Sequence, residues 1–292
     1  GLLVAWILDS RFGASSSLDA AALAAGIGLG LAGNLVLVVR ANRRKEMIFD
    51  FLPAESMTDA LGEMRLAVDT VFRTPTLKFL FVGGALVAFG MNGLVGWAPT
   101  FMARTHGMSL AEGTLLLGKW GLLAGTAGTL AGGFLADWLG RYTGRSRMIV
   151  STLGLLVGGP LGLWLLSVRD MSLFVPVFAA AFFFLTLYNG PVIAAVFDVV
   201  PARIGATVMG AYLLFIHVAG DAIALPLVGF LSDRFGIARA VFILPAASIA
   251  GGVVLFFGVR TVLRDIAFVA ARTTATHPVV LAGPRGSGAA GQ

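Results

Sequence analysis

LKFLFVGGALVAFGMNGLVGWAPTF, residues 77–101, carries a single charged side chain, Lys78. An α-helix rises about 1.5 Å per residue, so about 20 mostly apolar residues cross the roughly 30 Å hydrocarbon core of a bilayer. The stretch shows no alternation of apolar and polar residues, and this favours a helix over a barrel strand. It is therefore predicted to be a membrane-spanning helix.

Similar stretches lie on both sides of this one. The chain is 58% hydrophobic and 12% charged, whereas soluble domains run at about 25% charged. Too little charge is present to cover a water-facing globule, so the predicted fold class is all-α, a polytopic membrane helical bundle. The further complete candidates are 19–39, 110–136, 148–168, 172–197, 204–231 and 238–260, and residues 1–8 are predicted to be the tail of one more helix.

Several functional classes are excluded by composition. The chain has no cysteine, which rules out disulfides, thiolate metal sites and cysteine nucleophiles. His106, His217 and His277 are far apart and lack metal-ligand spacing, so neither a metal nor a cofactor is expected. The net charge of +6 comes from residues between hydrophobic blocks, which is typical of loops rather than of nucleic-acid binding. A membrane-embedded enzyme is disfavoured because the intramembrane ionisable residues are few and scattered.

The distribution of arginine and lysine predicts the orientation. One alternating set of loops, with the C-terminal tail, holds fifteen basic residues and the other set holds five. Basic loops stay in the cytoplasm. The segments 40–76 and 141–147 and the C-terminus are therefore expected on the cytoplasmic side.

The loop 40–76 carries apolar residues at helical spacing among acidic ones. It is predicted to contain an amphipathic helix, either on the membrane surface or, the favoured alternative, as an ordinary linker. The tail 261–292 is rich in Gly, Ala, Thr and Arg and is predicted to be disordered. Because the chain begins with Gly inside a hydrophobic run, it is interpreted as lacking the N-terminal helices of the same protein.

Two similar short segments of the sequence, a candidate internal repeat, support that interpretation. LVAWILDSRFG ends at Gly13 and LVGFLSDRFG ends at Gly236, each at a helix end on the outer side. Parallel repeats of this kind build many transporters. The repeat makes residues 1–8 helix five of a twelve-helix protein, and it places Asp233 and Arg234 in an outer-side loop motif.

The loop sequence GFLADWLGR, residues 133–141, carries the strongest chemical signal. An acid at a helix end can pair with an arginine across a tight turn that glycine permits. The stretch resembles the loop motif of the major facilitator superfamily, although Trp138 replaces its usual arginine. The alternative is a plain polar turn. The predicted gating residues are Gly133, Asp137, Gly140 and Arg141.

Other short motifs, in order, resemble the Spinster-like branch of that superfamily. They are GWAPTF at 96–101, YNGPV at 188–192, FDVVPAR at 197–203, IHVAGD at 216–221 and GFLSDR at 229–234. The resemblance implies the major-facilitator fold, with 1–39 ending the N-terminal bundle, 40–76 as central loop and 77–260 as the C-terminal six-helix bundle. It also implies proton-coupled or facilitative export of lysophospholipid-like or sphingolipid-like amphiphiles. The family's principal coupling carboxylates, on its first and fourth helices, fall outside this chain.

Ionisable residues inside predicted spans are costly and mark candidate functional sites. His217 and Asp221 are four apart on one helix face and could share a proton, or could form a structural hydrogen bond. Lys119 could attract an anionic headgroup or could extend its long stem outward to the surface. These residues are candidates for a proton or substrate site.

Glycines and prolines predict packing and kinks. Gly118, Gly121, Gly125, Gly128 and Gly132 form a small-residue stripe for close helix packing. The segment 109–112 is predicted to form a capping box. The sequence Asn-Gly-Pro at 189–191 interrupts a span, so Tyr188 and Asn189 are candidate cavity residues. Residues 97–99 are predicted to anchor the helix at the interface and end it.

These inferences predict a secondary transporter that moves amphiphilic or other small organic substrates by alternating access. The expected partners are the bilayer, the substrate and candidate coupling protons, and the expected location is the bacterial inner membrane. The runner-up is a major-facilitator carrier of organic anions or drugs, for which Lys119 discriminates. A non-transporting half acting as a binding or structural module is the remote alternative.

Overall fold

The computed structural model describes residues 54–276. The chain divides into two compact units, Gly1–Gly62 and Glu63–Gln292, and all the membrane-length helices of the described residues belong to the second. The described residues form helices and no β-strand. The spans predicted at 1–8 and 19–39 lie outside the described residues.

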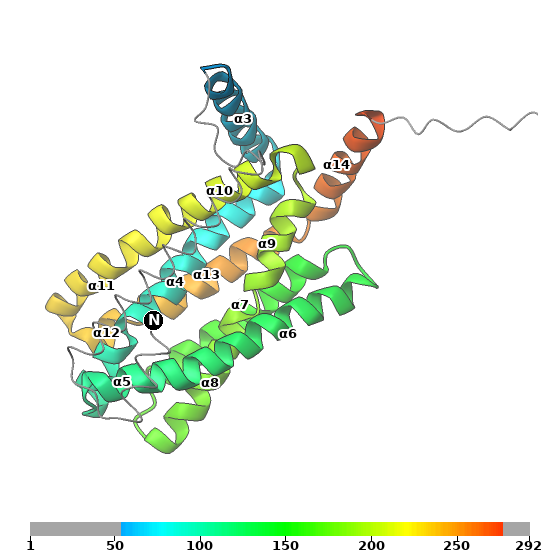
Figure 1. The fold of residues 1–292 in the computed structure, drawn as a ribbon. Coiled ribbons are helices and arrows are strands. Elements are labelled where there is room, and N and C mark those ends of the chain that lie inside the picture. The colour runs from blue at the N-terminus through cyan, green and yellow to red at the C-terminus, as the bar shows by residue number, and fades with distance from the viewer. Residues whose placement is uncertain (1–53, 277–292) are drawn as a thin grey trace, which may run out of the picture. The chain divides into compact units, whose positions relative to one another are not determined.

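Six helical segments are long and apolar enough to cross a membrane, and they confirm the six predictions from residue 77 onward. Two of them, α4 (Pro75–His106) and α7 (Ser146–Leu165), are continuous (Figure 1). The others are composite: α5 (Leu110–Leu116), η1 (Leu117–Gly121) and α6 (Leu122–Gly140); α8 (Met171–Thr186) and α9 (Asn189–Asp198); η2 (Ala202–Ile204), α10 (Gly205–Ile216), η3 (His217–Asp221) and α11 (Ala222–Phe235); α12 (Ile237–Ala240) and α13 (Ile243–Gly258).

The centre of the bundle is α13 packed between α4 and α7, with α8 on the other side of α7. The hydrocarbon-length windows of Pro75–His106 and Ser146–Leu165 are 56% buried. Those of Leu110–Gly140 and Ala202–Phe235 are only 17% buried. These two segments therefore each keep a broad open face, and both carry predicted site residues.

The glycine stripe on α6 packs as predicted over most of its length. Gly128 and Gly132 lie directly against the backbone of α8, where a Cβ would sit 2.2 Å from the Phe183 oxygen and 2.0 Å from the Leu187 oxygen. The prediction is wrong for Gly118, which has nothing within 4 Å of its Cβ position. Gly118 belongs to the open face of the segment.

The start of the segment 110–140 is capped as the sequence predicts. The backbone N–H of Glu112 donates to Ser109 Oγ at 3.2 Å, and the N–H of Ser109 donates to Glu112 Oε2 at 2.7 Å. Both hydrogen bonds of a capping box are therefore present.

Two sequence predictions are wrong, one about the end of a helix and one about the C-terminal tail. The predicted break near Pro99 is absent, because α4 runs through it to His106 and ends only at Gly107, whose φ of 68° is left-handed. Trp97 is held there instead by donating to the Leu225 carbonyl at 3.3 Å. The tail predicted to be disordered contains α14 (Val262–Thr276), and residues 277–292 lie outside the described part.

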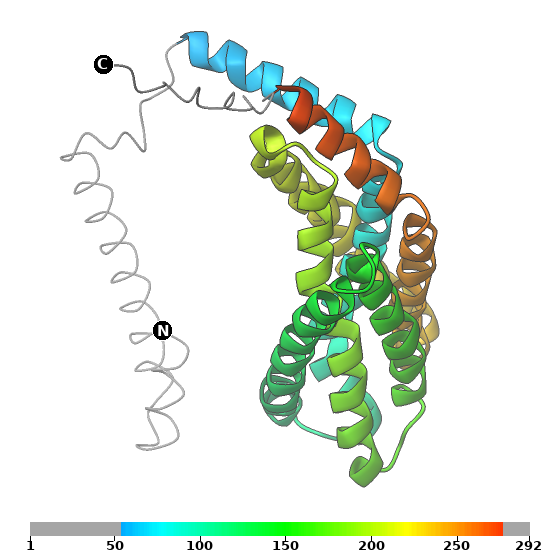
Figure 2. The same ribbon diagram turned by 90° about the vertical axis from the view of Figure 1, so that its right-hand side faces the viewer.

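The tertiary position of α14 explains its order. The Asp265 carboxylate is buried and accepts a hydrogen bond of 2.9 Å from the backbone N–H of Thr76, in the first turn of α4. The hydroxyls of Thr76 and Thr261 lie 2.7 Å apart. Figure 2 shows that α14 continues from α13 at the end of the bundle where α4 begins. The loop 40–76 does contain the predicted amphipathic helix, α3 (Ala54–Arg73).

Candidate functional site

The helix at 202–235 changes its winding where its ionisable residues lie. The turn η3, His217–Asp221, is a π-helix, which inserts one extra residue and is frequent at functional sites. Gly220 rests on α4, where a Cβ would lie 2.6 Å from the Ala85 carbonyl oxygen. Only glycine permits that approach, and it leaves His217 exposed on the open face.

His217 and Asp221 are paired. Nδ1 of His217 lies 2.5 Å from Oδ2 of Asp221, and the two side chains are 59% and 26% exposed. The second carboxylate oxygen, Oδ1, is buried and has no hydrogen-bond partner among the described residues. Oδ1 of Asp221 is therefore still able to accept a hydrogen bond, next to an imidazole that is already hydrogen-bonded.

Two tyrosines also lie inside the membrane-length segments. Tyr188 lies at the break between α8 and α9. Tyr212 on α10 is buried and packs edge-to-face on Phe81 of α4, with ring centroids 5.4 Å apart. Among the described residues, the polar region of these segments is therefore the His217–Asp221 pair, and neither tyrosine is hydrogen-bonded to it.

The break predicted at Asn-Gly-Pro is present, since α8 ends at Thr186 and α9 begins at Asn189. Pro191 has no N–H to bond to the Leu187 carbonyl four residues earlier, so that oxygen is released from the helix ladder. It faces Gly132 on α6. Beside it, Asn189 Nδ2 donates to Thr129 Oγ1 at 3.0 Å, which ties the break to the neighbouring helix.

Lys119 does not join this region. It is exposed in the second π-turn, η1, with its ammonium 5.3 Å from the centre of the Trp120 ring. Within the part of the chain that the structure describes, no ion pair holds it. The two π-turns thus coincide with the intramembrane ionisable residues of the two open segments, a regularity that the sequence periodicity did not reveal.

The predicted gating residues lie at the end of α6. Asp137 and Arg141 are both exposed, and among the described residues they do not pair with each other. At the same end of the bundle, Arg147 on α7 pairs with Asp198 on α9 and donates to the Ala194 carbonyl at 3.4 Å. Asp198 lies inside the FDVVPAR motif, yet its partner could not be read from the sequence.

At the opposite end, the outer-side motif closes α11. Asp233 is exposed, and the guanidinium of Arg234 lies 4.4 Å from the centre of the Phe230 ring. Gly236, with a φ of 79°, ends the helix. The geometry is that of a helix terminus and brings neither residue to the polar region.

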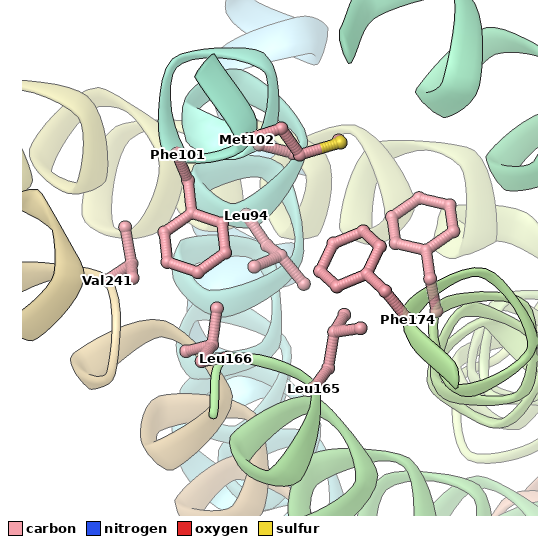
Figure 3. Close-up of a pocket in the computed structure, with 9 residues that line it drawn as sticks. Leu94, Phe101, Met102, Leu165, Leu166, Phe174 and Val241 are labelled. Carbon is pink, nitrogen blue, oxygen red and sulfur yellow. The ribbon is translucent and has the colours of Figure 1, made fainter. Parts of the chain in front are cut away.

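A small apolar cavity also lies near that end, between α4, α7 and α8 (Figure 3). It measures about 10 Å³, room for about one water molecule, and it contains none of the predicted site residues. Its walls, among them Leu94, Phe101, Leu165 and Phe174, are entirely apolar. We interpret it as a packing gap. The described residues also contain no cluster of metal-ligating side chains.

Comparison with known proteins decides the family. The family model described as Major Facilitator Superfamily matches residues 1–220. The chain belongs to the Major Facilitator Superfamily. It is therefore an integral, multi-pass membrane protein, and this membership points away from an enzyme.

The relatives of this superfamily member agree with the assignment. An MFS-type efflux pump of Mycolicibacterium smegmatis is 29% identical over 204 residues, covering 67% of this chain and 47% of the pump. A bacterial homologue of the human lysosomal transporter Spinster, inward-facing and unoccupied, matches with a TM-score of 0.58 and 22% identity, covering 68% of this chain and 50% of that one. Its occupied form gives 0.51, with 70% and 51% covered at 22% identity. The chain spans about half the length of these relatives.

Proposed function

We propose that this chain forms one bundle, and part of the other, of a secondary transporter that works by alternating access on amphiphilic or other small organic substrates. The observation that carries the proposal is the hydrogen-bonded pair of His217 and Asp221 inside an apolar span, in which the buried Oδ1 of Asp221 has no hydrogen-bond partner among the described residues. Such groups are costly in a bilayer and line transport pathways. A purely structural helix bundle does not need them.

The open faces of Leu110–Gly140 and Ala202–Phe235 support a two-bundle architecture. Placing the imidazole of His217 and the ammonium of Lys119 against lipid costs free energy. These faces are therefore proposed to meet the other bundle and the cavity between the two. The proposed division is 1–39 as the end of the N-terminal bundle, 40–76 as the central connection and 77–260 as the C-terminal bundle.

The His217–Asp221 pair is proposed as the proton-binding element. An imidazole can take up and release a proton, and its hydrogen bond to a carboxylate lets the two groups share that proton. Gain or loss of that proton changes the charge of the open face. Asp137 and Arg141, which do not pair with each other in this conformation, are proposed to latch the inward side when the bundles rock.

The test is transport by the full-length protein in proteoliposomes, with and without a pH gradient. We expect His217→Ala and Asp221→Asn to abolish the stimulation by the gradient. His106→Ala is the matched control, because His106 is held at a helix end by contacts with Thr105 and Val168. Unchanged gradient-dependent flux in both site variants would remove the pair from the mechanism.

A bacterial inner membrane is the proposed location, with the C-terminus in the cytoplasm. The M. smegmatis relative supports the first part, and the excess of arginine in 40–76, 141–147 and the tail supports the second.

Export of organic anions or drugs is the second candidate. It is favoured by the exposed Lys119 in an open π-turn and by the relative that is named an efflux pump. An anion carrier should lose substrate affinity in Lys119→Met. A carrier that binds only the apolar part of an amphiphilic substrate should keep its affinity in that variant.

A further inference from the structure

A second, larger groove opens between α6, α7 and α8 at the end of the bundle that carries residues 141–147. It measures about 360 Å³. Its walls include Leu135 and Trp138 from α6, Leu153 and Val157 from α7, Phe184 from α8, and Leu187 directly after α8. Its lining has no exposed polar surface, and Leu153 is 57% and Val157 40% exposed.

The groove lies at a definable depth in the bilayer. Trp138 forms part of its wall and packs edge-to-face on Tyr142, with ring centroids 5.6 Å apart. Tryptophan and tyrosine concentrate at the membrane–water interface. The remaining wall residues belong to helices that span the membrane. The groove therefore runs from the headgroup level into the hydrocarbon, where its natural occupant is an acyl chain.

The mouth of the groove is positively charged. Arg141 and Arg145 lie on the loop that joins α6 to α7, two of the helices that form the groove. Both are exposed, and neither forms an ion pair with any described residue. Arg147 is occupied by Asp198. Exposed Asp137 offsets one of the two remaining positive charges, so the mouth keeps a net positive charge.

We propose that this groove binds an anionic phospholipid of the adjacent leaflet, with one acyl chain between α6 and α7 and its phosphate beside Arg145 and Arg141. The assignment is independent of the transported substrate. The floor of the groove, Leu187, is the residue next to Tyr188 at the break of the α8–α9 segment. A bound chain therefore rests against the break between α8 and α9.

The experiment measures lipid retention by the full-length transporter. The protein is exchanged into nanodiscs of equimolar phosphatidylglycerol and phosphatidylcholine, and co-purifying lipid is quantified by native mass spectrometry. We expect the wild type to retain phosphatidylglycerol preferentially. Arg145→Ala should lower that preference about fivefold, the effect of removing one basic residue near an anionic surface. Val157→Trp should fill the groove and abolish retention.

Matched variants control for general effects. Val253→Trp places the same bulk on the exposed face of α13, and Arg169→Ala removes an arginine at the opposite end of α7. Both should retain phosphatidylglycerol as the wild type does. Equal retention of the two lipids by the wild type, or undiminished retention by Val157→Trp and Arg145→Ala, would overturn the proposal.

A second measurement distinguishes lipid from protein as the occupant. The chain has no cysteine, so a single Val157→Cys can carry a bimane fluorophore once any cysteines elsewhere in the protein are replaced. Doxyl-labelled lipids should quench this fluorophore as strongly as one at Val253→Cys. Fluorescence at 157 that lipid quenchers cannot reach would show that another part of the transporter covers the groove, and would overturn the proposal even if the tryptophan variant failed to fold.

Discussion

At the scale of single residues, close contact between backbones decides what each glycine does. Gly132 and Gly133 are neighbours on α6, yet only at Gly132 would an added Cβ meet another backbone. A Cβ at Gly132 would lie 2.0 Å from the Leu187 oxygen, whereas nothing lies within 4 Å of the corresponding position at Gly133. Sequence spacing alone treats both as parts of a small-residue helix.

The pair makes a direct stability test. Gly132→Ala should destabilise the bundle by about 1–3 kcal/mol, because an overpacked interface must shift backbone. Gly133→Ala should be neutral, or stabilising by about 0.5–1 kcal/mol through the lower entropy of the unfolded chain. Thermal unfolding in detergent measures both, and equal melting temperatures for the two variants would contradict the packing shown in the structure.

The Arg147–Asp198 pair provides another test at this scale. Its side chains are 34% and 29% exposed, so solvent screens the pair in part. Asp198→Asn leaves Arg147 unpaired beside the Ala194 carbonyl and should cost about 1–2 kcal/mol, less than the loss for a fully buried pair. A double-mutant cycle with Arg147→Met measures the coupling, and additive effects of the two changes would show that the contact contributes nothing.

At the scale of helical elements, the termini and irregular turns are fixed by groups far away in sequence. The N–H of Thr76, in the first turn of α4, has no partner within its own helix. Asp265, 189 residues later, accepts its hydrogen bond. The π-turns η1 and η3 likewise sit where helices pack on neighbours through Gly121 and Gly220. Local propensity describes neither feature, because the partners come from other elements.

The cap on α4 is testable by amide hydrogen exchange. Asp265→Ala should cost about 1–2 kcal/mol, the usual loss for a helix N-cap, and should speed exchange at Thr76 and Leu77. Asp233→Ala is the control, since Asp233 is exposed at the end of α11. Unaltered exchange in the first turn of α4 would mean that α14 does not cap this helix.

At the scale of the whole molecule, consecutive spans cross the membrane in opposite directions, so consecutive loops lie on opposite sides of it. The connections at 141–145 and 199–203 lie at one end of the bundle, and those at 107–109, 166–170 and 236 lie at the other. A chain that crosses a bilayer six times between residues 75 and 258 must expose these two sets to opposite compartments.

Single cysteines test this arrangement. Thr143→Cys should react with a membrane-impermeant maleimide only from the cytoplasmic side, and Ser167→Cys only from the outer side. Labelling of both from the same side in intact cells would contradict the threading. Cytoplasmic labelling of Ser167→Cys alone would instead reverse the proposed orientation while leaving the fold intact.

The amino-acid sequence was enough to predict the fold class, the six spans from residue 77 onward, the Ser109–Glu112 cap and the break at Asn189. These features depend on hydrocarbon thickness, on the missing N–H of proline and on contacts within four residues, all of which are local. Packing between helices settled what the sequence left open: α4 continues past Pro99, α14 is ordered, and Gly118 lies on an open face. Those outcomes depend on which helix faces which, and the apolar pattern of a membrane helix encodes this weakly because lipid and protein neighbours are equally apolar.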